Sequence, residues 1–272
     1  MLIEVGHNLN TLDEALKMCI RDRPMGVYIT MECPRVKKRD VDARRAVSAL
    51  LGEELGRLLP PGEGDVLVIG LGNRTVTPDA LGPLAVDHTL VTRHLRRERP
   101  ELTGAMASVC ALSPGVMGVT GIESGEIVRA VVDAVSPRAV IAIDSLAARA
   151  LDRLSSTVQL TDTGIQPGSG VGNHRAALTR ETLGVPVLAV GVPMVIHAAA
   201  LARDAFRLLS DEDESRLDAL MRELMDGDLG DMIVTPREVD DLVDNAAVML
   251  AGGINRALHP GLSDEEILTM MQ

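Results

Sequence analysis

Runs of aliphatic residues that end in glycine or aspartate most constrain the fold of this chain. Three of them are VLVIG (Val66–Gly70), AVIAID (Ala139–Asp144) and VPVLAVG (Val185–Gly191). Such runs are typical of strands buried on both faces, as in parallel sheets covered by helices. Segments with helical spacing of apolar residues separate them, so strand and helix alternate along the chain. The sequence therefore predicts an α/β fold, three-layer αβα, with a mainly parallel sheet.

The same patterns place the individual elements. Strands are expected at 65–72, 108–112, 139–149, 156–162 and 185–196. Helices are expected at 39–59, 83–95, 126–135, 176–183 and 197–209, and from Thr235 as N-cap, with Pro236 at the first helical position, towards His259. A charged segment over 210–231 is expected to be partly helical and to connect the core to that last helix.

Composition narrows the class of protein. The chain carries a net charge of −12 without a basic stripe interleaved with aromatic rings, which argues against a nucleic-acid groove. Its three cysteines lack a CxxC spacing, which argues against a zinc site or a disulfide framework. No stretch approaches the roughly 18 apolar residues of a membrane span. We therefore expect a cytoplasmic protein that uses no cofactor and contacts neither membrane nor nucleic acid directly.

The N-terminus is set apart from the rest of the chain. Residues Lys17–Arg23, KMCIRDR, resemble the translation of a sequencing adapter. Residues 1–24 are therefore interpreted as a non-native or artefactual segment and excluded from the functional argument. Residues 25–272 are predicted to form a single α/β domain with a C-terminal helix.

Two aspartates stand where chemistry is expected in such a sheet. Asp144 ends one aliphatic run, and Asp79 lies in the loop that follows another. Active crevices of open α/β sheets lie beyond the carboxyl ends of the strands, so both carboxylates are expected at the same edge. Two acidic groups there can share a proton or hold a water. Asp79 is equally well explained as a helix N-cap. For Asp144 a purely structural explanation is weaker, because a carboxylate after five apolar residues must be satisfied by backbone amides, Arg149 or a partner group.

Other candidate centres have weaker support. The loop Gly70–Asn73, GLGN, matches neither a dinucleotide fingerprint nor a Walker motif. No serine stands in a GxSxG elbow. A phosphorylase-like enzyme would have only Arg74, His174 and Arg175 to hold phosphate. His197 follows an aliphatic run, and most histidines at such a position only begin a helix.

Six strings together resemble one known family. They are GLGN…VTPDALGP (Gly70–Pro83), PGVMGVTGIES (Pro114–Ser124), AIDSLAAR (Ala142–Arg149), DTGIQPGSGVGN (Asp162–Asn173), ETLGVPVLAVGVP (Glu181–Pro193) and VTPREVD (Val234–Asp240). In this order they resemble the spore germination protease family, atypical aspartic endopeptidases of endospore-forming bacteria. The resemblance runs from about Tyr28 to His259.

The resemblance implies a specific activity. The chain would be a hydrolase that degrades small acid-soluble spore proteins during germination, with Asp79 and Asp144 as catalytic residues. Asn73, Thr77, Arg149, Asn173 and His197 would bind substrate or support the pair. The family is made as a zymogen, assembles as a homotetramer and works in the cytoplasm of the spore core. Its fold is similar to that of hydrogenase-maturation endopeptidases.

Three departures from the family pattern modify this expectation. A TDLAVE-like propeptide motif is absent, and most of an insertion before the last helix is missing. GVPMVIHA replaces the family's GVPTVVDA, so His197 stands in place of an aspartate. Asp79, Asp144 and His197 would then suit a divalent metal ion. The alternative function is a metal-dependent processing peptidase related to the hydrogenase-maturation enzymes. A scaffold without activity is disfavoured because both aspartate motifs are intact.

Overall fold

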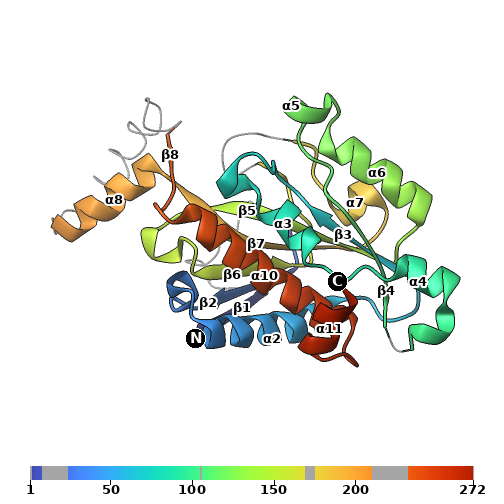
Figure 1. Ribbon diagram of the computed structural model, residues 1–272. Helices are drawn as coiled ribbons and strands as arrows, with labels where there is room; N and C mark the ends of the chain where they lie inside the picture. Colours follow the sequence, from blue (N-terminus) through green and yellow to red (C-terminus); the bar gives the residue numbers. More distant parts are fainter. Residues whose placement is uncertain (1, 8–23, 105, 169–174, 210–231, 272) are drawn as a thin grey trace.

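A computed structural model describes residues 2–7, 24–104, 106–168, 175–209 and 232–271 of the chain. Eight strands form one sheet in the order β1-β2-β6-β7-β5-β3-β4, with β8 paired to the end of β7 (Figure 1). The strands are β1 (Leu2–His7), β2 (Val27–Glu32), β3 (Asp65–Gly70), β4 (Ser108–Leu112), β5 (Ala139–Ala148), β6 (Thr157–Thr161), β7 (Val187–His197) and β8 (Ile233–Val234).

The α/β class is confirmed, and the sheet is mixed. Strands β4, β3, β5 and β7 are parallel neighbours, as predicted. Strands β6, β2, β1 and β8 join them antiparallel. Only eight residues, 149–156, separate β5 from β6. A parallel crossover needs a dozen residues or more, so the chain reverses direction at this point.

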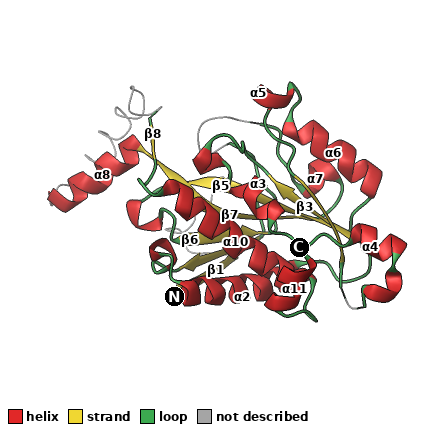
Figure 2. Cartoon of the chain, in the orientation of Figure 1, coloured by secondary structure: helices red, strands yellow, loops and turns green. Residues whose placement is uncertain are grey.

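Helices cover both faces of the sheet (Figure 2). One face packs against α2, α3 and α10, and the other against α6 and α7. The helix bounds are α2 (Val41–Leu58), α3 (Leu81–Asp87), α4 (Arg93–Glu98), α5 (Met117–Thr120), α6 (Ser124–Val135), α7 (Arg180–Leu183), α8 (Ala198–Leu209), α10 (Val239–Leu258) and α11 (Asp264–Met270). In the described residues, no helix combines the length and the apolar character needed to cross a membrane.

Three helix predictions differ from the structure. The helix expected over 83–95 is split into α3 and α4, because Asn255 binds the intervening backbone: its side chain accepts from Leu90 N at 2.9 Å and donates to His88 O at 2.9 Å. The last long helix begins at Val239, whereas the sequence predicted Pro236. Only Arg180–Leu183 of the expected helix 176–183 is helical. The predicted helical stretch over 210–231 lies outside the described residues.

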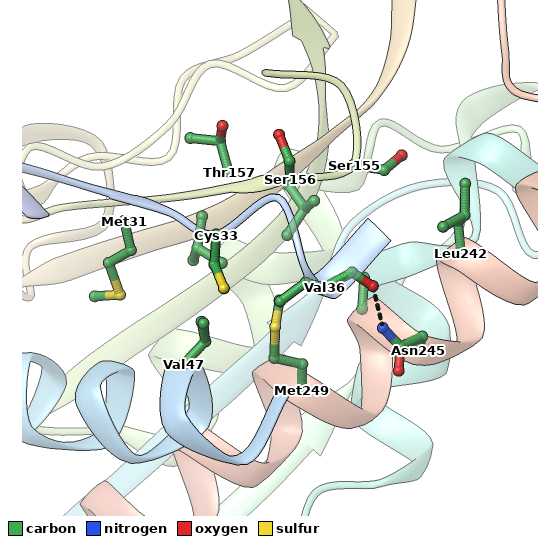
Figure 3. A pocket seen from close by; sticks show the side chains of 13 residues that line it. Met31, Cys33, Val36, Val47, Ser155, Ser156, Thr157, Leu242, Asn245 and Met249 are labelled. Carbon is green, nitrogen blue, oxygen red and sulfur yellow. Dashed lines mark hydrogen bonds between the residues drawn. The ribbon is translucent and has the colours of Figure 1, made fainter. Parts of the chain in front are cut away.

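The larger core lies between the sheet and the pair α2 and α10. Figure 3 shows a small, mostly apolar pocket there, lined by residues that include Cys33, Val47 and Met249. At its border the side-chain amide of Asn245 donates to Val36 O at 3.3 Å. Helices α2 and α10 approach closely: a β-carbon built at Gly253 would lie 2.8 Å from Leu51 Cγ.

Gly253→Ala is expected to lower the free energy of unfolding by about 1–3 kcal/mol, because the added methyl group overlaps Leu51 in a well-packed contact. Gly56→Ala on α2 is the matched control, since a β-carbon at Gly56 meets nothing within 4 Å. That variant should gain up to about 1 kcal/mol from helix propensity. Urea unfolding of both variants checks the prediction, and equal effects would contradict it.

Candidate active site

Asp144 lies in β5, one residue beyond the level at which the neighbouring parallel strand β3 ends. The last residue of β3, Gly70, pairs with Ile143, so Asp144 is the first residue of β5 beyond the end of β3. On the other side Asp144 pairs with Gly191 of β7. Asp144 is only 6% exposed, and its Oδ1 accepts a hydrogen bond from Ser145 N at 2.9 Å. A carboxyl group is therefore buried at the carboxyl edge of the sheet.

Asp79 reaches the same edge from the loop after β3. It ends a single 3-10 turn, Thr77–Asp79. Asn73 N donates to Asp79 Oδ2 at 2.8 Å and to Asp79 O at 3.1 Å, which closes the loop on itself. Gly72, at φ +116°, allows this closure, because a β-carbon there would lie 2.0 Å from Asp79 O. The predicted N-cap role is not observed: the α-helix that follows has no side-chain cap.

The two carboxyl groups act on each other electrostatically. Burial raises the pKa of Asp144 to about 7, and the negative charge of Asp79 contributes to this rise. The Ser145 amide and the positive charge of Arg175 act in the opposite direction on that pKa. Burial also raises the pKa of Asp79, against the Asn73 amide and Arg175. Burial and a like charge are the expected causes of such shifts.

This arrangement separates the two protonation states. Near neutral pH, Asp144 retains a proton much more readily than an exposed carboxyl does, and Asp79 has the smaller tendency to be protonated. Two interacting carboxyl groups that hold one proton between them offer an acid and a base in one site. The site can therefore activate a water and protonate an oxygen in the same step.

The structure places the predicted supporting residues in two groups. Asn73 and Thr77 belong to the loop that carries Asp79. Arg149 lies five residues beyond Asp144, is exposed, and accepts a hydrogen bond from Arg203 at its backbone oxygen. Asn173 lies outside the described residues. Of the three that the structure describes, Asn73, Thr77 and Arg149, only Asn73 has a hydrogen bond to the pair.

His197 is not brought to the carboxyl pair. It lies six residues beyond Gly191, the partner of Asp144, which is about 20 Å along the strand. Strand β7 is 11 residues long and continues past the edge where the carboxyl groups lie. The proposed metal set of Asp79, Asp144 and His197 therefore does not assemble. In the residues that the structure describes, no group of three histidine, cysteine, aspartate or glutamate side chains is placed to hold a metal ion.

Two residues of the site were not predicted to act there. Ser145 donates from its hydroxyl to Pro78 O at 2.6 Å and so joins the Asp79 turn to β5. Arg175 is the cation whose charge acts on both carboxyl groups, whereas the sequence suggested it only as a phosphate ligand. Adjacency to Asp144 was the available signal for Ser145. Local sequence offered none for Arg175.

Asp144→Asn should stabilise the protein at neutral and alkaline pH. Because folding raises the pKa of Asp144 above its unfolded value, the protonated form is favoured on folding, and stability falls as pH rises from about 4 through 7. The variant avoids that loss, so it should exceed the wild type by roughly 1–4 kcal/mol at pH 8 and match it near pH 4. Unfolding curves at both pH values, with exposed Asp133→Asn as control, test this. A constant difference across pH would refute it.

Known proteins resemble this chain over most of its length. The family model described as germination protease matches residues 9–211. The germination protease of Caldanaerobacter subterraneus subsp. tengcongensis is 43% identical over 265 residues, and that of Clostridium perfringens is 41% identical over 266; each alignment covers 90% of this chain and 82% of the relative. The germination protease of Bacillus subtilis is 38% identical, covering 88% and 80%.

The structure was also compared with solved structures. A [NiFe] hydrogenase maturation protease, HycI from Thermococcus kodakarensis, aligns with a TM-score of 0.41 and 17% sequence identity. The alignment covers 75% of this chain and 98% of that one.

Proposed function

This chain belongs to the germination protease family, and from that premise we propose that it is an aspartic-type endopeptidase that degrades small acid-soluble spore proteins during germination. Membership of the family makes the chain a protease connected with germination. The observation that supports the catalytic part is the pair of carboxyl groups, Asp79 and Asp144, with the pKa of Asp144 raised to about 7.

The electrostatics support a different role for each carboxyl group. Asp79, as carboxylate, takes a proton from a water whose oxygen attacks the scissile carbonyl carbon. Asp144, as carboxylic acid, gives its proton to the carbonyl oxygen. The tetrahedral intermediate then collapses: the proton on Asp79 passes to the leaving nitrogen, the C–N bond breaks, and Asp144 regains a proton from the hydroxyl group. The pair is returned to its starting state.

Family membership supports the remaining proposals. We expect the enzyme to work in the cytoplasm of the spore core, to be made as a zymogen and to assemble as a homotetramer. Its partner would be the protein substrate. A metal-dependent processing peptidase is not favoured, because the described residues place His197 far from the carboxyl pair.

Cleavage of a purified small acid-soluble spore protein tests the function. Asp79→Asn and Asp144→Asn should each lower kcat by at least about 100-fold, because each removes one proton-transfer group. Exposed Asp133→Asn should cleave like the wild type. The products are followed by mass spectrometry, with and without a chelator. Cleavage that persists in both active-site variants would rule out the pair, and loss on chelation would support a metal enzyme.

The pH dependence of cleavage tests the assigned roles. Above pH 7, kcat/KM should fall as Asp144 loses the proton it must donate. At acid pH it should fall again as Asp79 becomes protonated, at a value above the usual carboxyl pKa because burial raises it. A profile between pH 4 and 9 should therefore be bell-shaped. Activity that rises steadily from pH 7 to 9 would contradict the assignment.

A further inference from the structure

We propose that Ser145 is a positioning residue of this peptidase, because its hydroxyl group holds the turn that carries Asp79 against the strand that carries Asp144. The inference rests on the proposed roles of the two carboxyl groups. It assigns a function to Ser145, which takes no part in the proposed proton transfers.

Strand geometry places the Ser145 hydroxyl on the side where the Asp79 turn lies. Successive side chains on a strand point to opposite faces. Ser145 follows the alternation of Ile141 and Ile143, whose side chains belong to the core that packs against α3. Helix α3 directly follows the Asp79 turn in the chain. The hydroxyl therefore points to the face on which the turn begins, and it donates to Pro78 O at 2.6 Å.

Ser145 contacts both halves of the pair. Its backbone N–H donates to Asp144 Oδ1 at 2.9 Å, which orients that carboxyl group. Its side chain binds the carbonyl group directly before Asp79, across 67 residues of sequence. One residue therefore orients one carboxyl group and anchors the peptide that precedes the other.

The remaining bonds of the turn do not replace this contact. The Asn73 amide bonds lie within the loop itself. Leu71 N donates to Ile143 O of β5 at 2.8 Å, but this bond holds the start of the loop, eight residues before Asp79. The turn has no side-chain cap at its N-terminus, and Pro78 has no N–H to donate. The hydroxyl bond thus ties this loop to the strand that it must face.

A shift of the turn away from β5 changes the electrostatics of the pair, because the interaction between two charges weakens as their distance grows. Among the residues that the structure describes, the charged groups that act on Asp144 are Asp79 from the turn and Arg175 from the segment before α7. If the turn moves away, the influence of Asp79 weakens while β5 keeps Asp144 in place. The reacting geometry is lost as well, and errors near 1 Å can cost about 100-fold in rate.

The test compares two serine-to-alanine variants of the full chain. Ser145→Ala removes the bond to Pro78. Ser48→Ala removes a similar hydroxyl-to-carbonyl bond of 2.8 Å, to Met249 O, where α2 meets α10. Cleavage of a purified small acid-soluble spore protein gives kcat and KM, and 13C NMR of labelled aspartate follows the Asp144 carboxyl without substrate. Ser145→Thr serves as the rescue, because it keeps the hydroxyl.

The proposal expects Ser145→Ala to lower kcat by about 10-fold to 100-fold with KM within about twofold. The titration midpoint of Asp144 should move to lower pH, and so should the alkaline limb of the rate profile. Ser145→Thr should restore the wild-type kcat, the wild-type midpoint and the wild-type alkaline limb. Ser48→Ala should lower only the stability of the fold and leave kcat and the Asp144 midpoint unchanged. If Ser145→Ala keeps the wild-type kcat and the wild-type Asp144 midpoint, the proposal is overturned.

Two further comparisons keep the result interpretable. If the alanine variant does not fold, Ser145→Cys, which keeps the size and weakens the donor, replaces it with the same expected direction and the same contrary outcome. If Asp79→Asn and Asp144→Asn still cleave the substrate, the proposed function fails. The substrate-free Asp144 titration then still decides whether Ser145 positions the pair.

Discussion

The parallel pairing of β5 with both β3 and β7 is the constraint on which the rest of the molecule depends. It buries the first six residues of β5 and sets the three strands in register. Because β3 ends level with Ile143 while β5 continues to Ala148, the first side chain of β5 beyond the end of β3 is that of Asp144. The loop after β3 must then turn back over this edge, and it brings Asp79 with it. Chain direction and strand length thus produce the site.

Burying a carboxyl group at this point has opposite effects on stability and on chemistry. An ionised group that loses water is destabilising, so the fold favours the neutral form of Asp144. The same preference keeps an acid available near neutral pH, which a solvent-exposed aspartate cannot provide. The site is a region where the fold is less stable than an uncharged side chain would make it, a frequent property of active centres.

Patterns of neighbouring residues in the sequence predicted the parallel strands and the position of the two aspartates. Aliphatic runs identified the parallel strands, and the aspartates at their ends identified the pair. Long-range contacts decided the remainder. Asn255 divides α3 from α4 from 165 residues away, and the Ser145 contact with Pro78 spans 67 residues. The misplacement of His197 has the same origin: the strand was predicted to end at residue 196, but only its pairing with β5 shows that this end lies beyond the level of Asp144.

The close packing of α2 against α10 joins the two ends of the described domain. Residues of both helices share the larger core, with Leu51 against Gly253 at the crossing. During synthesis α2 leaves the ribosome some 180 residues before α10 does, since α2 ends at Leu58 and α10 begins at Val239. Contacts so distant in sequence form late. A nascent chain can therefore pair its parallel strands early, yet it cannot close this core until α10 has been synthesised, so a stably folded protease forms only after that helix has emerged.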